Sequence, residues 1–153
     1  MRIIILSMLL VVSSFVYGQE EKSAAESQKN RIGLHAGVTT GIGLSYRYKP
    51  GKFALQLTGI PIFTGDGSTV VSGGLSAMYY LREASAADLF TYFGNHVFYN
   101  DEMFYNMGLG IGIDFHPWKE VLDITLQGGY GILRVNDDPI SIPTIEVGLY
   151  YRF

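Results

Sequence analysis

The sequence predicts an all-β fold, an eight-stranded antiparallel up-and-down β-barrel, and three observations support this prediction. Residues 31–153 divide into about eight segments in which apolar and polar residues alternate, separated by short connections rich in Gly, Pro, Asn and Asp. No stretch there has the caps and the 3.6-residue periodicity of a long helix. Residues 143–153 keep alternating up to the final aromatic residue, so the chain is expected to end inside a strand.

Residues 1–18 have the features of a secretory signal peptide. A basic second residue precedes an apolar run over residues 3–12, and small residues follow. Val16 and Gly18 fit the positions three before and one before a cleavage site, and the apolar run is short for a membrane-spanning helix. An uncleaved N-terminal anchor is the alternative to a cleaved leader.

The polar segment that follows, residues 19–30, contains no aromatic and no β-branched residue. It cannot bury enough apolar surface to order itself, so we predict a flexible leader. The barrel domain is then residues 31–153, in a single domain. For residues 82–87, a short helical turn is an alternative to a plain connection between strands.

The strands expected in this domain cover residues 32–38, 41–48, 52–63, 69–81, 88–98, 103–115, 121–134 and 143–153.

Charge and cysteine content narrow the function classes. The formal net charge is −3. Removal of the signal peptide, which contains Arg2, leaves 10 basic and 14 acidic residues and a charge of −4. An acidic chain of this kind is not expected to bind nucleic acid. The absence of cysteine excludes a disulfide framework and a lipoprotein anchor. No cofactor and no metal site are expected.

Lysine placement predicts which face of the strands points outward. Alternation alone leaves open a secreted soluble barrel with its apolar face inside. A water-facing exterior normally mixes Lys with Glu, whereas a narrow lumen favours small residues. All lysines after residue 18 lie in the leader or at turns: Lys22, Lys29, Lys49, Lys52 and Lys119. We therefore predict that the apolar faces meet lipid and that the barrel is transmembrane.

Aromatic residues gather near the expected ends of the strands, as in the interfacial girdles of membrane barrels. With both chain ends in the periplasm, the periplasmic girdle is expected to comprise Tyr46, Tyr48, Phe53, Tyr79, Phe115, Trp118, Tyr151 and Phe153. The same rim is expected to include Tyr80, Phe90 and Tyr150. A second, extracellular group comprises Phe63, Phe98, Tyr99, Phe104 and Tyr105.

The chain resembles the small outer membrane barrels of the OmpA/OmpX type in its signal peptide, its number of strands and its C-terminal sequence GLYYRF at residues 148–153. The Gly-rich strands and the Tyr-Arg-Phe end are similar to many such proteins of Bacteroidota. The resemblance covers residues 31–153. It implies a monomer in contact with outer membrane lipid and lipopolysaccharide, inserted by the barrel-assembly machinery, with Tyr151 and Phe153 as the assembly signal. The short outer loops and the lack of a peptidoglycan-binding domain leave adhesion and wall anchoring unsupported.

Five charged residues fall on the polar faces and are expected to fill the lumen as an ionic network: Arg47, Asp114, Asp123, Glu146 and Arg152. Asp123 and Arg152 lie on adjacent strands and are the best candidate pair, with Asp114 as a shared neighbour and Arg47 across the lumen. A buried charge without a partner costs several kcal/mol, so these groups are expected to pair. The alternative is a proton path or a solute constriction.

The three histidines matter because the lipid A deacylases and palmitoyltransferases are also eight-stranded barrels that use Ser and His. A nucleophile needs a base within hydrogen-bond reach and a third group behind it. No such set occurs around His35, His96 or His116 at a recognisable spacing, so no enzyme is predicted. The glycines of residues 108–112 are interpreted as close lumen packing rather than as a phosphate loop.

The acids of residues 101–102 and 137–138 are interpreted as solvated turn residues, with divalent cations bridging lipopolysaccharide as the alternative. Together these observations predict an outer membrane barrel with a filled lumen and a structural or surface-interaction role in the cell envelope. A small-solute conduit, a lipid A-modifying enzyme and a soluble secreted barrel stay open as alternatives.

Overall fold

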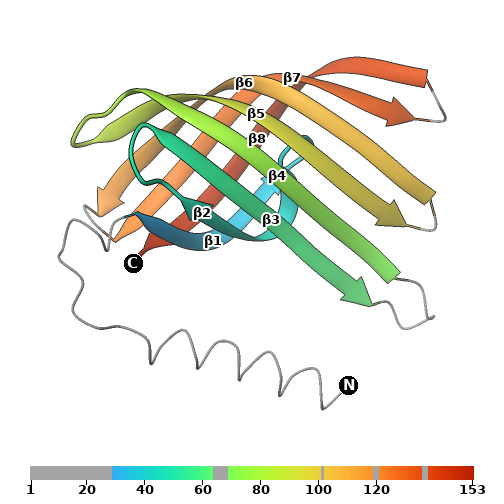
Figure 1. Ribbon diagram of the computed structural model, residues 1–153, viewed down its shortest axis with the longest axis horizontal. Coiled ribbons are helices and arrows are strands. Elements are labelled where there is room, and N and C mark those ends of the chain that lie inside the picture. The colour runs from blue at the N-terminus through green and yellow to red at the C-terminus, as the bar shows by residue number, and fades with distance from the viewer. Residues whose placement is uncertain (1–28, 64–68, 101, 119–120, 136–137) are drawn as a thin grey trace, which may run out of the picture.

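A computed structural model describes residues 29–63, 69–100, 102–118, 121–135 and 138–153 (Figure 1). The predicted signal peptide, nearly all of the predicted leader, and the turn acids Asp101 and Asp137 lie outside the described residues. Within the described part of the chain, no helix is long and apolar enough to cross a membrane.

The described chain is a closed antiparallel barrel in which each strand pairs with its sequence neighbours and β1 pairs with β8. The strands are β1 (Asn30–Gly37), β2 (Gly41–Tyr48), β3 (Phe53–Phe63), β4 (Thr69–Arg82), β5 (Ala87–Asn100), β6 (Glu102–Trp118), β7 (Leu122–Val135) and β8 (Asp138–Arg152). The prediction of eight antiparallel strands in up-and-down order is therefore confirmed.

Strands β6 and β8 extend furthest beyond their predicted ends. Strand β6 continues through the residues expected to form a turn at His116–Trp118, because a register shift between Phe115 and Trp118 accommodates Pro117 without ending the pairing. Strand β8 begins at Asp138 rather than at Pro143. The alternative of a helical turn over residues 82–87 is wrong, since this connection is a bend between β4 and β5.

The apolar faces of the strands point outward, as the lysine placement predicted. Leu57, Leu109 and Ile145 are 63%, 63% and 80% exposed, while the alternating positions carry buried polar groups such as Arg47 and Asp114. A soluble barrel has the opposite arrangement, with its apolar face inside. The exterior of this barrel therefore suits lipid rather than water.

Five aromatic residues expected at the two rims have inward positions instead: Tyr80, Phe90 and Tyr150 at one rim, and Phe98 and Phe104 at the other. Tyr80, Phe90 and Tyr150 are fully buried, whereas their neighbours Tyr79 and Tyr151 are exposed. Because successive side chains of a strand alternate between its faces, nearness to a strand end does not decide which aromatic reaches the membrane interface.

Strands β1 and β2 have eight residues each, against 11 to 17 in the other six. We call the end of the barrel with Asn30 and Arg152 the terminal end and the opposite end the far end. Pairing of β2 with β3 stops at Leu44 with Gly59, and β3 to β8 continue toward the far end (Figure 1). The turn between β1 and β2, residues 38–41, is called the inner turn because Thr39 and Thr40 are fully buried.

Candidate functional site

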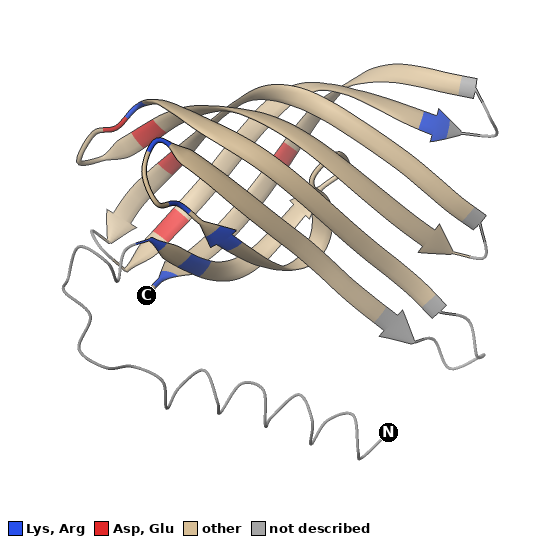
Figure 2. Cartoon of the chain, in the orientation of Figure 1, with Lys and Arg blue, Asp and Glu red and all other residues tan. Residues whose placement is uncertain are grey.

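Charged residues gather at the terminal end of the barrel, while the described parts of the long strands beyond the inner turn are nearly free of them (Figure 2). Two lumen clusters follow from this distribution. The ionic cluster comprises Arg31, Arg47, Asp114, Asp123 and Arg152. The second cluster surrounds Glu146, which the structure places apart from the other predicted network residues.

Asp114 is the centre of the ionic cluster. Its carboxylate accepts hydrogen bonds from Arg31 Nη1 at 2.9 Å and from Arg47 Nη1 at 2.9 and 3.0 Å. The hydroxyls of Tyr80 and Thr125 each donate to it at 2.6 Å. Asp114 and Arg47 are fully buried, so two guanidinium groups and two hydroxyls replace the water that the carboxylate loses.

Asp123 forms the second acidic position of this cluster. It is bound by Arg152, whose Nε donates at 2.8 and 2.9 Å and whose Nη2 makes a further ion pair. Arg31 Nη1 lies 3.0 Å from Asp123 and thereby joins the two aspartates. The sequence prediction omitted Arg31, because it stands one residue before the predicted start of the first strand. Arg31 could have been predicted to point into the lumen, because it lies on the same face of the strand as His35.

A further group of charges covers the terminal end of the ionic cluster. Lys49 Nζ lies 2.6 Å from Glu83 and 3.0 Å from Asp88, and it sits 3.7 Å from the centroid of the Tyr80 ring. His116 is 2.7 Å from Asp123 through Nδ1. These polar contacts therefore continue from the rim of the barrel to the ionic cluster.

Glu146 on β8 binds the inner turn. Its Oε1 accepts the backbone N–H of Thr39 at 2.7 Å and the Thr39 hydroxyl at 2.8 Å. Its Oε2 accepts the hydroxyl of Thr40 at 2.5 Å and the amide of Gln127 at 2.7 Å. His35 Nε2 lies 2.6 Å from the Thr40 hydroxyl. Each oxygen of this buried carboxylate thus accepts two hydrogen bonds, which replace the water that the carboxylate loses.

The inner turn fits against glycines on the opposite strands. A Cβ at Gly108 or Gly131 would lie 2.6 Å from the methyl carbon of Thr39, and a Cβ at Gly94 would lie 2.6 Å from the methyl carbon of Thr40. A Cβ at Gly74 would overlap the backbone of Thr40. Strands β4 to β7 each contribute one of these positions, so the turn crosses the lumen and contacts the strands opposite β1 and β2. Gly108 therefore serves the close lumen packing expected from the sequence.

Side chains of β4, β5 and β6 also hold the base of the inner turn. The Val38 carbonyl accepts His96 Nδ1–H at 2.8 Å and Asn106 Nδ2–H at 3.2 Å. The Ile42 N–H donates to Ser72 Oγ at 3.0 Å. Both ends of the turn are thereby fixed to the wall by polar contacts.

Ser72 and His96 form a pair that spacing along the sequence did not reveal. Ser72 Oγ lies 2.9 Å from His96 Nε2, although 24 residues separate them. The antiparallel register of β4 and β5, which sets Gly74 opposite His96, brings them together. The partner of the other ring nitrogen is the Val38 carbonyl rather than a carboxylate, so the pair holds the inner turn and has no acid behind the histidine.

The structure places the predicted girdle residues at the terminal end, with seven of them exposed and Phe153 half-buried: Tyr46, Tyr48, Phe53, Tyr79, Phe115, Trp118, Tyr151 and Phe153. The exposed fraction is largest for Trp118, at 63%. Among the described residues, no group of three or more His, Asp or Glu side chains is arranged to hold a metal ion.

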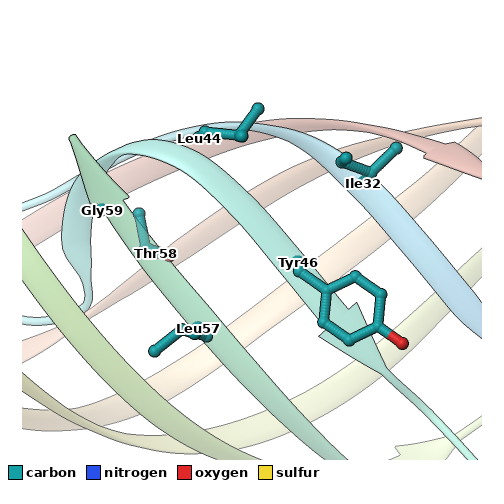
Figure 3. A pocket seen from close by; sticks show the side chains of 6 residues that line it. All are labelled: Ile32, Leu44, Tyr46, Leu57, Thr58 and Gly59. Carbon is teal, nitrogen blue, oxygen red and sulfur yellow. The ribbon is translucent and has the colours of Figure 1, made fainter. Parts of the chain in front are cut away.

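The outer surface carries a groove of about 370 Å³ over the paired parts of β1, β2 and β3 (Figure 3). Its walls come from three strands and are mostly apolar, and its lining residues are Ile32, Leu44, Tyr46, Leu57, Thr58 and Gly59. Gly59 is the last residue of β3 that pairs with β2. We call this feature the outer groove.

Comparison with known proteins gives similarity in structure only. No family model and no curated protein sequence matches the chain. Among solved structures, it is similar to Neisserial surface protein A, with a TM-score of 0.48 and 13% identity over 81% of this chain and 93% of the other. It is also similar to Ail, the attachment invasion locus protein of Yersinia pestis, with a TM-score of 0.40 and 15% identity over 81% of this chain and 96% of the other. The architecture itself rests on the closed strand pairing and the outward apolar faces of this chain.

Proposed function

We propose that this protein is an outer membrane β-barrel with a closed lumen that serves the cell envelope through a structural role or through surface interactions. The observation that carries the proposal is the combination of an apolar exterior with a polar interior filled by the chain itself. Leu34 and Ile111 are 64% and 62% exposed, whereas Arg47, Thr39 and Glu146 are at most 1% exposed. Such a distribution is stable only where the surroundings of the barrel are apolar.

The orientation in the membrane follows from the number of strands, because an even number places both ends of the barrel chain on one rim, which is the periplasmic rim in outer membrane barrels. Exposed aromatic residues concentrate at the terminal end, where they would lie among lipid headgroups. The terminal end, with the N-terminus and C-terminus of the barrel, is then periplasmic and the far end extracellular. Contact with lipopolysaccharide at the far end, insertion by the barrel-assembly machinery through Tyr151 and Phe153, and a monomeric state belong to the same proposal.

Two successive obstructions argue against a small-solute conduit. A solute entering from the terminal end meets the ionic cluster, in which Arg47 is hydrogen-bonded to Asp114 and to Gln56. A solute entering from the far end meets the inner turn, which is bound to Glu146. An eight-stranded barrel has room for little beyond its own side chains, so both obstructions fill the available width.

The decisive experiment combines localisation with conductance. The mature chain should fractionate with outer membranes, require detergent for extraction and migrate differently on gels before and after heating, because a folded barrel resists the detergent at room temperature. Reconstituted into planar bilayers of defined lipid, it should give no stepwise conductance. Recovery of the chain in the soluble periplasm without detergent would contradict the membrane assignment, and regular conductance steps would favour the conduit.

A further inference from the structure

The barrel wall is interrupted on one side beyond the inner turn. Strand β8 pairs with β1 only as far as Val147 with Ala36, although β8 extends to Asp138. Strand β3 pairs with β2 only as far as Gly59, although β3 continues to Phe63. At eight residues, β1 and β2 are also shorter than the roughly 9–11 residues that a spanning strand uses. We call the interval between the unpaired parts of β3 and β8 the lateral gap.

Prolines occupy the edges of the lateral gap at positions where a backbone N–H would point into it. The N–H of Phe153 donates to the Asn30 carbonyl of β1, so alternate residues of β8 direct their backbone groups to the β1 side. Counting back by twos places Pro143 and Pro139 at such positions. These two edge positions therefore offer no donor.

The same reasoning applies to β3. The Lys52 carbonyl accepts the Tyr80 N–H of β4, so even-numbered residues of β3 face β4 and odd-numbered residues face β2. Pro61 is the first odd-numbered residue beyond the end of the β2–β3 pairing at Gly59. Proline at an unpaired edge prevents the addition of a further strand. The lateral gap is thus built to stay open to non-peptide occupants.

The inner wall beside the lateral gap is apolar. One residue on each of β3 to β8, at the inward parity and beyond the inner turn, has an aliphatic or aromatic side chain that is only partly buried: Ile60, Val70, Phe98, Phe104, Leu133 and Ile142. We call this set the inner apolar ring. The lumen of a membrane barrel is normally polar, because it faces water and other polar side chains. Apolar surface exposed inside this part of the barrel gains free energy when an apolar molecule covers it.

The outer groove lies next to the lateral gap on the outside of the barrel. Its lining includes Gly59, and the lateral gap begins at the next residue, Ile60 (Figure 3). In the proposed membrane orientation the lateral gap faces the hydrocarbon of the outer part of the bilayer, and the outer groove extends from it toward the periplasmic girdle at Tyr46. The molecules present there in excess are lipids with acyl chains.

We propose that the lateral gap admits an acyl chain of a membrane lipid, which lies along the outer groove and covers the inner apolar ring. This inference rests on the proposed membrane location of the barrel. It assigns the far half of the barrel as a lipid-binding site, with the headgroup outside the wall and the chain inside. The inner turn forms the floor of the site, because it crosses the lumen below the ring.

Photolabelling from the lipid tests this assignment. The full mature chain is reconstituted into dioleoylphosphatidylcholine vesicles containing a phosphatidylcholine with a diazirine near the end of one acyl chain. After illumination, the adducts are mapped by mass spectrometry. Lipid around the barrel labels only outward side chains, such as Tyr105. The proposal expects additional adducts on inward residues of the ring, including Phe104 on the same strand.

Two matched variants separate the inner site from the outer surface. Phe104→Gln makes the ring more polar and should lower the yield of inward adducts about tenfold, since loss of contact with two methylene groups corresponds to roughly that factor. Tyr105→Gln changes the neighbouring outward residue and should leave inward labelling unchanged. A similar yield of inward adducts in both variants would overturn the assignment.

The failure of this inference can be distinguished from failure of the proposed function. If the chain floats with the vesicles and migrates as a heat-modifiable barrel, but adducts occur only on outward residues, the acyl-chain site is wrong and the membrane assignment stands. If the chain does not float, both are wrong. Crosslinks between β3 or β8 of two copies would show that a second chain, rather than a lipid, occupies the lateral gap.

Discussion

Glu146 on β8 accepts both the backbone N–H and the hydroxyl of Thr39 in the β1–β2 turn, at 2.7 and 2.8 Å. A single carboxylate thereby holds a hairpin turn inside the barrel. The turn would otherwise extend the shortest two strands toward the far end, and its inward course creates both the closed lumen and the lateral gap above it. The position of these two residues therefore links the filled interior to the open side of the wall.

Glu146→Gln is expected to loosen the inner turn. Glutamine keeps one acceptor oxygen but replaces the second with an amide that cannot accept the Thr40 and Gln127 donors. Loss of charge-assisted hydrogen bonds at this buried site should lower the free energy of unfolding by about 2–4 kcal/mol. Urea unfolding in detergent, followed through the fluorescence of Trp118, measures the change.

Glu83→Gln is the control for this variant. It removes the same charge from a partly exposed ion pair with Lys49, so its effect should be below about 1 kcal/mol. Equal unfolding midpoints for the Glu146 and Glu83 variants would contradict the role assigned to Glu146.

Gly108→Ala is expected to press on the inner turn. The added Cβ would lie 2.6 Å from the methyl carbon of Thr39, so the turn or β6 must shift at a cost of about 1–3 kcal/mol. Gly73→Ala is the matched control, because nothing lies within 4 Å of its added Cβ. It should change the unfolding free energy by less than about 0.5 kcal/mol.

Removing the Thr39 side chain tests the cause of the Gly108 effect. In a double-mutant cycle with Thr39→Gly, relief of the overlap should appear as a coupling free energy of about 0.5–3 kcal/mol between the two sites. Purely additive unfolding free energies would show that the inner turn does not contact Gly108 as described.

Most of the strand architecture could be predicted from the sequence, because alternation at period two directly encodes which side chains share a face. The outward residues of β2, which are Ile42, Leu44, Tyr46 and Tyr48, follow that pattern throughout. Tyr80 and Tyr150 were predicted wrongly because nearness to a strand end suggested the rim, whereas their parity places both inside.

The inner turn could not be predicted from Thr39 and Thr40 themselves, because these residues suit an ordinary hairpin turn. Its signal was distributed over four strands, in the inward glycines Gly74, Gly94 and Gly108 and in Gly131. Only the packing of distant elements shows that these glycines leave space for one turn. Contacts between residues far apart in sequence, such as Ser72 with His96, depend in the same way on register.

Within the ionic cluster, loss of Arg47 is expected to cost more than loss of Arg152. Arg47→Leu leaves the fully buried Asp114 with Arg31 as its remaining guanidinium, and removes a cation that lies 4.2 Å from the Tyr150 ring centroid. The expected loss in unfolding free energy is about 3–5 kcal/mol.

Arg152→Leu should cost only about 1–3 kcal/mol, because Asp123 keeps its contacts with Arg31 and His116. Urea unfolding midpoints of the two variants rank the effects. An unchanged midpoint for Arg152→Leu, or a larger loss than for Arg47→Leu, would contradict the described division of the cluster.

Phe153→Ala is expected to impair assembly in cells more than stability in detergent. Phe153 donates its N–H to the Asn30 carbonyl at 3.0 Å, where β8 meets β1, and alanine retains this backbone contact. The side chain is half-buried, so its removal should lower the free energy of unfolding in detergent by less than about 1.5 kcal/mol. If the aromatic ring is the assembly signal, the amount of heat-modifiable barrel in outer membranes should nevertheless fall severalfold.

Tyr46→Ala, which removes an outward aromatic residue at the same end, is the control and should assemble normally. A normal cellular yield of the Phe153 variant would show that its ring is not the signal, and an equal defect in both variants would point to the girdle instead.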